Sequence, residues 1–176
     1  MVNKTKIRNL ILYFINNIPV SELGKTKLYK LIFFVDSLAY EIQGSTVTGD
    51  KYLKFPMGPV PVSVSGILHE MNENGSITID VMLKQGYFMT SYTPNKLPDM
   101  NVFNGTELGI IGEVFTSKSK KSRSELINLS HQMSSWVMAN DFEEMDLSTD
   151  YHKSLSPSPQ EFVKEYKNDI TILSKE

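Results

Sequence analysis

Gly24-Lys25-Thr26 has the composition of the end of a phosphate-binding loop. That motif also requires a glycine five residues before Gly24, where this chain has Pro19, and a strand ahead of the loop, where the residue pattern is helical. A backbone cradle for phosphate is therefore not expected. Gly24 is better explained as a cap at the turn between two helices.

The three histidines do not form a catalytic or metal-binding pattern. His69 has no second histidine four residues away, so a helical zinc pair is missing. Ser130-His131 lacks the flanking glycines of a nucleophile elbow, and adjacent helical residues point in different directions. We interpret His131 as a structural residue and expect no metal and no cofactor.

Asp36 stands inside an otherwise apolar segment. A buried carboxylate there could act as a general base, or it could be satisfied by backbone groups or a tyrosine hydroxyl. No second carboxylate stands at a useful spacing, so no acid–base scheme is complete and the satisfied carboxylate is favoured. We therefore predict that the protein is not an enzyme; a hydrolase that relies on Asp36, Glu70 or His131 is the catalytic alternative.

Composition limits the class of protein. The chain has 176 residues, enough for one core, and no cysteine, which fits a reducing compartment and predicts a cytoplasmic protein without disulfides. No apolar run approaches the ~18 residues of a membrane span, so no membrane partner is expected. With 18 basic and 20 acidic residues, a bulk polyanion binder is not expected. Two basic clusters, Lys118–Arg123 and the lysines and arginine between Lys4 and Lys30, keep nucleic-acid binding open.

Hydrophobic periodicity predicts the elements that position these residues. Apolar residues at three- and four-residue steps predict helices over Lys4–Ile18 and from about Leu28 to Gly44. The second helix is apolar nearly all round, so we expect neighbours to bury it on several sides. Its expected core stripe is Leu28, Leu31, Ile32, Val35, Ala39 and Ile42.

The middle of the chain predicts strands and turns. Lys51–Pro61 is interpreted as a short strand followed by a Met57-Gly58-Pro59 turn, with a helix from about Val60 to Asn72. Alternating apolar residues in Ile77–Leu83, with Tyr87–Thr93 after a turn, predict a half-buried hairpin.

The remaining elements are helical. A capping pair, Asn104 with Glu107, opens a helix with the apolar residues Leu108, Ile111, Val114 and Phe115. Further helices are expected at Glu125–Ser130, at Ser134–Asn140, and from a capping box at Ser158 to about Lys167. The prediction is a mainly helical α+β single domain over 1–145, with a buried central helix and a small antiparallel sheet, and an extension over 146–176 that holds a short helix.

Three phrases of the sequence stand out together. They are Lys27–Asp36 (KLYKLIFFVD), Phe55–Val60 (FPMGPV), and Leu129-Ser130-His131 with a tryptophan five residues later. In this order and spacing they resemble the Panacea domain family, the SocA-like antitoxins of toxin–antitoxin systems. The resemblance extends from about Lys4 to Asn140. The segment before Gly58 departs from it, because the family more often has a tryptophan and a tyrosine there. The matched residues, which we interpret as mostly structural, are Lys27, Leu28, Lys30, Leu31, Phe34, Asp36, Phe55, Gly58, Pro59, Val60, Ser130, His131 and Trp136.

The resemblance implies a protein that neutralises a co-encoded toxin by direct contact. One branch of the family resembles a proteolytic adaptor that hands its toxin to a AAA+ protease, so such a protease is a second expected partner. The alternative is a DNA-binding transcriptional regulator of a mobile element or phage. Aromatic and methionine residues near the two predicted turns are the candidate partner contacts: Tyr52, Phe55, Met57, Tyr87, Phe88 and Met89. The alternative for Phe55, Met57 and Phe88 is ordinary membership of the core.

Overall fold

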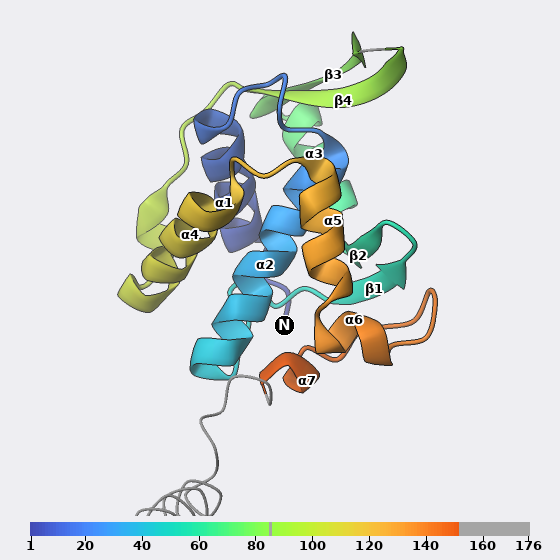
Figure 1. Cartoon of the computed structure of the whole chain (residues 1–176). Coiled ribbons are helices and arrows are strands. Elements are labelled where there is room, and N and C mark those ends of the chain that lie inside the picture. Colours follow the sequence, from blue (N-terminus) through green and yellow to red (C-terminus); the bar gives the residue numbers. More distant parts are fainter. Residues whose placement is uncertain (85, 152–176) are drawn as a thin grey trace, which may run out of the picture.

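The computed structural model describes residues 1–84 and 86–151, and the side chains of residues 82, 84, 87 and 151 lie outside this description. Helix α2 (Lys25–Gln43) runs through the middle of the molecule (Figure 1). Gly24 caps its beginning, and Gly44 ends it with a φ of 67°, a conformation that favours glycine. The predicted central helix is therefore confirmed.

The α+β, mainly helical fold is also confirmed. Helices α1, α4 and α5 surround α2 (Figure 1). The side chain of Asn3 caps α1, and capping boxes at Asn104 and Ser122 open α4 and α5. The helices besides α2 are α1 (Lys4–Asn17), α3 (Val64–Glu73), a 3₁₀ helix (Met100–Val102), α4 (Gly105–Lys118), α5 (Arg123–His131), α6 (Ser134–Met138) and α7 (Ser148–Tyr151).

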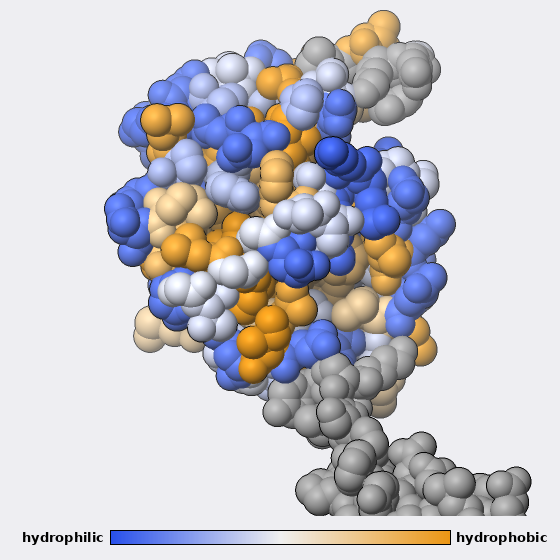
Figure 2. Space-filling view, turned by 60° about the vertical axis from the view of Figure 1, so that its left-hand side comes forward, coloured by the Kyte–Doolittle hydropathy of each residue, from blue (hydrophilic) through white to orange (hydrophobic). Residues whose placement is uncertain are grey.

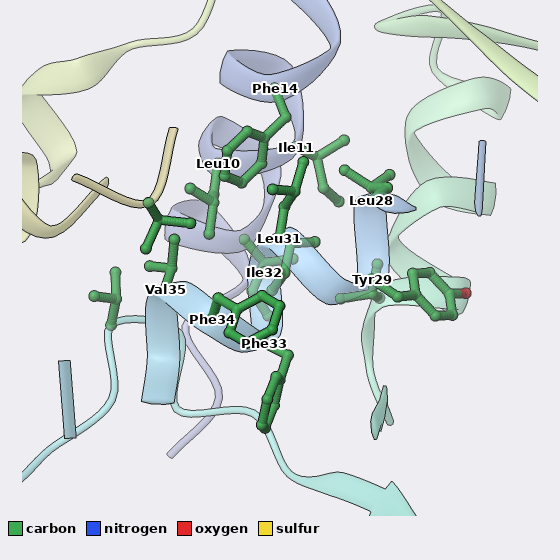
Figure 3. Close-up of a cluster of buried hydrophobic side chains, with 14 of the residues drawn as sticks. Leu10, Ile11, Phe14, Leu28, Tyr29, Leu31, Ile32, Phe33, Phe34 and Val35 are labelled. Carbon is green, nitrogen blue, oxygen red and sulfur yellow. The ribbon is translucent and has the colours of Figure 1, made fainter. Parts of the chain in front are cut away.

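The core is built between α1 and α2. Figure 3 shows Leu10, Ile11 and Phe14 of α1 facing Leu31 and Ile32 of α2, and all five are fully buried. Two positions predicted to point inward are exposed instead. Ile42 lies in the last turn of α2, and Leu108 lies in the first turn of α4, where Ile110 is buried in its place.

The strands form two antiparallel two-stranded sheets, whereas one small sheet was predicted. The first pairs β1 (Tyr52–Phe55) with β2 (Gly58–Pro61), and the second pairs β3 (Ile77–Lys84) with β4 (Tyr87–Pro94). The helix predicted from about Val60 to Asn72 is present as α3, but its start was placed too early, because Gly58-Pro59-Val60-Pro61 forms β2 and α3 begins only at Val64.

The second hairpin departs from the predicted half-buried pattern. Ile77 and its neighbour Tyr92 are buried near the body, but Val81 and Leu83 are each 69% exposed. The hairpin extends past the helices that would cover this face (Figure 1).

Packing continues past residue 145. Leu147 is buried, and the buried Asp150 accepts hydrogen bonds from the Ser135 backbone N–H and hydroxyl at 2.8 and 2.6 Å. The helix predicted from Ser158 and the histidine His152 lie outside the described residues.

Candidate functional site

The three sequence phrases meet at the turn between β1 and β2. Lys30 of α2 is buried, and its Nζ donates a hydrogen bond to the Pro59 carbonyl oxygen at 2.7 Å. A side chain at Gly58 would place its Cβ 2.5 Å from Ser130 Oγ and 3.0 Å from Lys30 Nζ. The three segments, far apart in the sequence, therefore form one cluster.

Gly58 is required at this point for two reasons. Its φ is 86°, which side-chain-bearing residues rarely adopt. The space that a Cβ would occupy is already filled by Ser130 and Lys30. The glycine therefore allows β2 to approach both α2 and α5.

Lys30 is a basic side chain buried in the body of the protein. Only 1% of the residue is exposed, and burial lowers the pKa of Lys30 to about 7. Its hydrogen bond to Pro59 holds β2 against α2.

His131 and Trp136 form the outer wall of this cluster. Their rings are stacked, with centroids 4.0 Å apart and an interplanar angle of 17°. Lys54 Nζ lies 4.3 Å from the centroid of Trp136 and donates to the Ala139 carbonyl oxygen at 2.9 Å. Burial and the positive charges of Lys30 and Lys54 lower the pKa of His131, whereas a hydrogen bond with the Pro56 backbone opposes that shift.

Ser130 and His131 do not act on each other as a dyad would. Ser130 Oγ donates to the Ile127 carbonyl oxygen at 2.8 Å, and the His131 ring packs on Trp136. The structural role of His131 stays a prediction. Among the described residues, neither the indole N–H of Trp136 nor His131 Nε2 has a hydrogen-bond partner.

Asp36 is fully buried and satisfied. It accepts hydrogen bonds from the Thr48 hydroxyl, from the Thr48 backbone N–H at 2.9 Å, and from the Tyr52 hydroxyl at 2.7 Å. Burial raises the pKa of Asp36 to about 6, although these hydrogen bonds act in the opposite direction. The hydrogen bond from Tyr52 to Asp36 thus connects β1 to α2 inside the protein.

The residues of the catalytic alternative do not meet. Asp36 contacts Thr48 and Tyr52, and His131 stacks on Trp136. Glu70 lies on the surface, paired with Lys4 and Arg8 at 2.9 and 2.7 Å. Within residues 1–84 and 86–151, no group of three or more acidic or histidine side chains is arranged to hold a metal ion.

An exposed apolar patch lies at the turn between β1 and β2. We call it the turn patch, and it consists of Phe55, Met57 and Phe142. The exposed fractions are 36% for Phe55, 44% for Met57 and 60% for Phe142. The rings of Phe55 and Phe142 meet edge to face, with centroids 5.2 Å apart. The Phe142 backbone N–H donates to the Lys54 carbonyl oxygen at 2.7 Å, so this segment lies alongside β1.

The predicted partner contacts differ in their exposure to solvent. Phe55 and Met57 are on the surface, whereas Tyr52 is buried with its hydroxyl on Asp36 and supports the turn from inside. Met89 is half-buried on the other hairpin, and the side chain of Tyr87 lies outside the described residues.

Sequence reasoning missed Phe142 and Lys54. Phe142 is a single aromatic residue in an acidic stretch, Asp141 to Glu144, which is the one signal that could have marked it. Lys54 has no comparable signal, because its role depends on Trp136, which follows much later in the chain.

The buried helix α2 thus holds the hairpin of β1 and β2 through two side chains, Lys30 on the Pro59 carbonyl oxygen and Asp36 on the Tyr52 hydroxyl. Residues 28–137 match the family described as antitoxin SocA-like, Panacea domain. Because this match covers more than half of the 176 residues, the chain belongs to that family. The family indicates a toxin–antitoxin role, with a toxin as the kind of partner.

No curated protein shows significant similarity to the chain, and no solved structure does either. Among the described helices, none combines the length and hydrophobicity needed to cross a bilayer.

Proposed function

We propose that this protein is an antitoxin that neutralises a co-encoded toxin by direct contact through the turn patch. The observation that carries the proposal is the pairing of an exposed apolar turn with a buried cluster that fixes its shape. Phe55 and Met57 project from a turn held by Lys30 and Gly58. A preformed surface loses little conformational entropy on binding, which favours affinity.

The composition of the turn patch suits a protein partner. Protein interfaces concentrate their binding energy in a few aromatic or methionine side chains that a polar rim surrounds. Here Phe55, Met57 and Phe142 are the apolar side chains, and the exposed carboxylates of Asp141 and Glu143 lie next to Phe142 in the chain.

The direct test is co-expression with the product of the neighbouring gene. We expect a complex that survives size-exclusion chromatography and restores growth to cells that express the toxin. In the double variant Phe55→Ala/Phe142→Ala, the dissociation constant should rise at least about tenfold, because two contact residues are lost.

Leu97→Ala is the matched control, since Leu97 is a highly exposed apolar residue outside the turn patch. A double variant that binds the toxin as tightly as the wild type would remove the turn patch from the proposal. Failure to bind any neighbouring gene product would remove the antitoxin proposal itself.

Delivery of the toxin to a AAA+ protease is a finer form of the same proposal. In that case the half-life of the toxin in cells should shorten when this protein is present, and inactivation of the protease should restore it. An unchanged half-life together with rescued growth would favour neutralisation by contact alone.

The DNA-binding alternative receives less support. Lys4 and Arg8 are paired with Glu70, and Lys6 is paired with Glu107 at 2.6 Å, so these three basic residues are neutralised by ion pairs. The net charge of −2 also disfavours association with a polyanion.

A further inference from the structure

A second surface lies beyond the turn patch, in a groove of about 780 Å³ beside β4. Its walls come from the loop before α2, from β4, and from the connection between α4 and α5. Figure 2 shows one face of the molecule, on which apolar residues are exposed between larger hydrophilic areas. We call the groove beside β4 the basic groove.

The basic groove has a charge opposite to that of the whole chain. Five basic side chains line it against two acidic ones, although the chain carries a net charge of −2. One of the two carboxylates, Glu125, already accepts a hydrogen bond from the Ser122 backbone N–H at 2.8 Å. The five basic residues are Lys25, Lys27, Lys120, Lys121 and Arg123.

Three of these cations are available to a ligand. Lys120 and Arg123 are exposed and Lys121 is half-buried. Within the described parts of the chain, none of the three forms an ion pair. The N-terminal basic residues Lys4, Lys6 and Arg8, by contrast, all do.

The opposite wall is apolar. Phe88 is 78% exposed, and Met89 reaches toward Gly24, where an added Cβ would lie 3.1 Å from its Cγ. A ligand in the basic groove would therefore meet cations on one side and apolar side chains on the other.

We infer that the basic groove binds an extended acidic segment of a protein partner. Carboxylates of that segment pair with Lys120, Lys121 and Arg123, and one of its apolar side chains packs on Phe88 and Met89. The assignment of this segment to the toxin rests on the proposed function.

A protein segment fits these features better than a nucleic acid. The apolar wall includes the thioether of Met89, which offers a peptide side chain a flexible contact. The cations are also confined to one groove rather than spread along a face, as a long polyanion would require.

The test uses the full chain and a fluorescein-labelled peptide in which glutamates and aspartates alternate with leucine and phenylalanine. Fluorescence anisotropy should show saturable binding at low salt that weakens about tenfold or more at about 300 mM salt, because the contacts are ionic. A peptide of the same length with glutamine and asparagine in place of the acidic residues should bind far more weakly.

Two pairs of variants locate the site. Lys120→Glu/Lys121→Glu should weaken binding of the acidic peptide about tenfold or more, whereas Lys96→Glu, a reversal at another exposed lysine, should leave it unchanged. Phe88→Ala should weaken it about fivefold, whereas Leu97→Ala should not. Thermal unfolding of each variant verifies that it is folded.

Several results would overturn the inference. These are absence of binding by the acidic peptide, equal binding of the neutral peptide, or binding unaffected by the groove variants. Tighter binding of a single-stranded oligonucleotide that the same variants abolish would assign the groove to nucleic acid instead.

The peptide measurement requires no toxin, so the two proposals can fail separately. Peptide binding without a toxin complex would remove the antitoxin proposal and keep the groove. A toxin complex without peptide binding would support the antitoxin proposal and contradict the inference about the basic groove.

Discussion

At the scale of single residues, the site depends on the close packing of Ser130 and Lys30 against Gly58. The missing side chain of Gly58 leaves room for Ser130 Oγ and Lys30 Nζ, and Lys30 uses that room to reach the Pro59 carbonyl oxygen. None of these groups is on the surface. Their effect on binding is therefore indirect, through the shape of the turn.

Gly58→Ala should lower the free energy of unfolding by about 2–4 kcal/mol, because it combines left-handed strain with a steric clash. The control is Gly75→Ala, at a φ of 71° with no heavy atom within 4 Å of the added Cβ. That control should cost only about 1–2 kcal/mol. Urea denaturation measures both, and equal losses would contradict the packing role of Gly58.

Lys30 should make stability depend on pH. Because its pKa is lowered to about 7, the unfolded chain binds more protons than the folded chain above pH 7, up to the ordinary lysine range. Relative to Lys30→Met, the wild type should therefore gain stability as pH rises from 7 toward 9.5, at no more than about 1.4 kcal/mol per pH unit.

The measurement is urea denaturation at several pH values for both proteins. Lys96→Met, at an exposed position, controls for the loss of one positive charge. If the difference in free energy of unfolding between wild type and Lys30→Met is constant over this pH range, burial does not lower the pKa of Lys30.

At the scale of elements, periodicity predicted the helices well and the strands less well. The apolar repeats and capping residues located α1, α2 and α4. Strand β2 was missed because Gly58-Pro59-Val60-Pro61 resembles a turn, although proline is compatible with an edge strand. The exposure of Val81 and Leu83 was missed because alternation shows which residues share a face but not how far the covering helices reach.

Part of the candidate site could also be predicted. The matched phrases included Lys30, Gly58, Ser130 and His131, and the structure brings them together. The contact of Phe142 with Phe55 could not be predicted, because a pair so distant in sequence is set by tertiary packing.

Two isoleucines of α2 should differ sharply in their contribution to stability. Ile32→Ala removes a fully buried side chain from the core in Figure 3 and should cost about 2–5 kcal/mol. Ile42→Ala, at a residue 56% exposed, should cost less than about 1 kcal/mol. Chemical denaturation of the two variants checks this, and similar losses would contradict the central position of α2.

At the scale of the whole molecule, the net charge of −2 is distributed unevenly, because one surface is flanked by acidic residues and the other is lined by basic residues. The turn patch joins Phe55 and Met57, from the hairpin of β1 and β2, with Phe142 of the acidic segment Asp141–Glu144. The basic groove lies beside β4, and the hairpin of β3 and β4 is separate from that of β1 and β2 (Figure 1). A partner that contacts both would be matched in charge at two separate places, which supports selectivity more than affinity.

Hydrogen–deuterium exchange of the protein, alone and with the co-encoded toxin, tests most directly whether the turn patch is the contact surface. The account predicts that the backbone amides of Leu53–Gly58 and Asp141–Glu144 exchange more slowly in the complex. A stable complex in which both segments exchange as fast as in the free protein would contradict it.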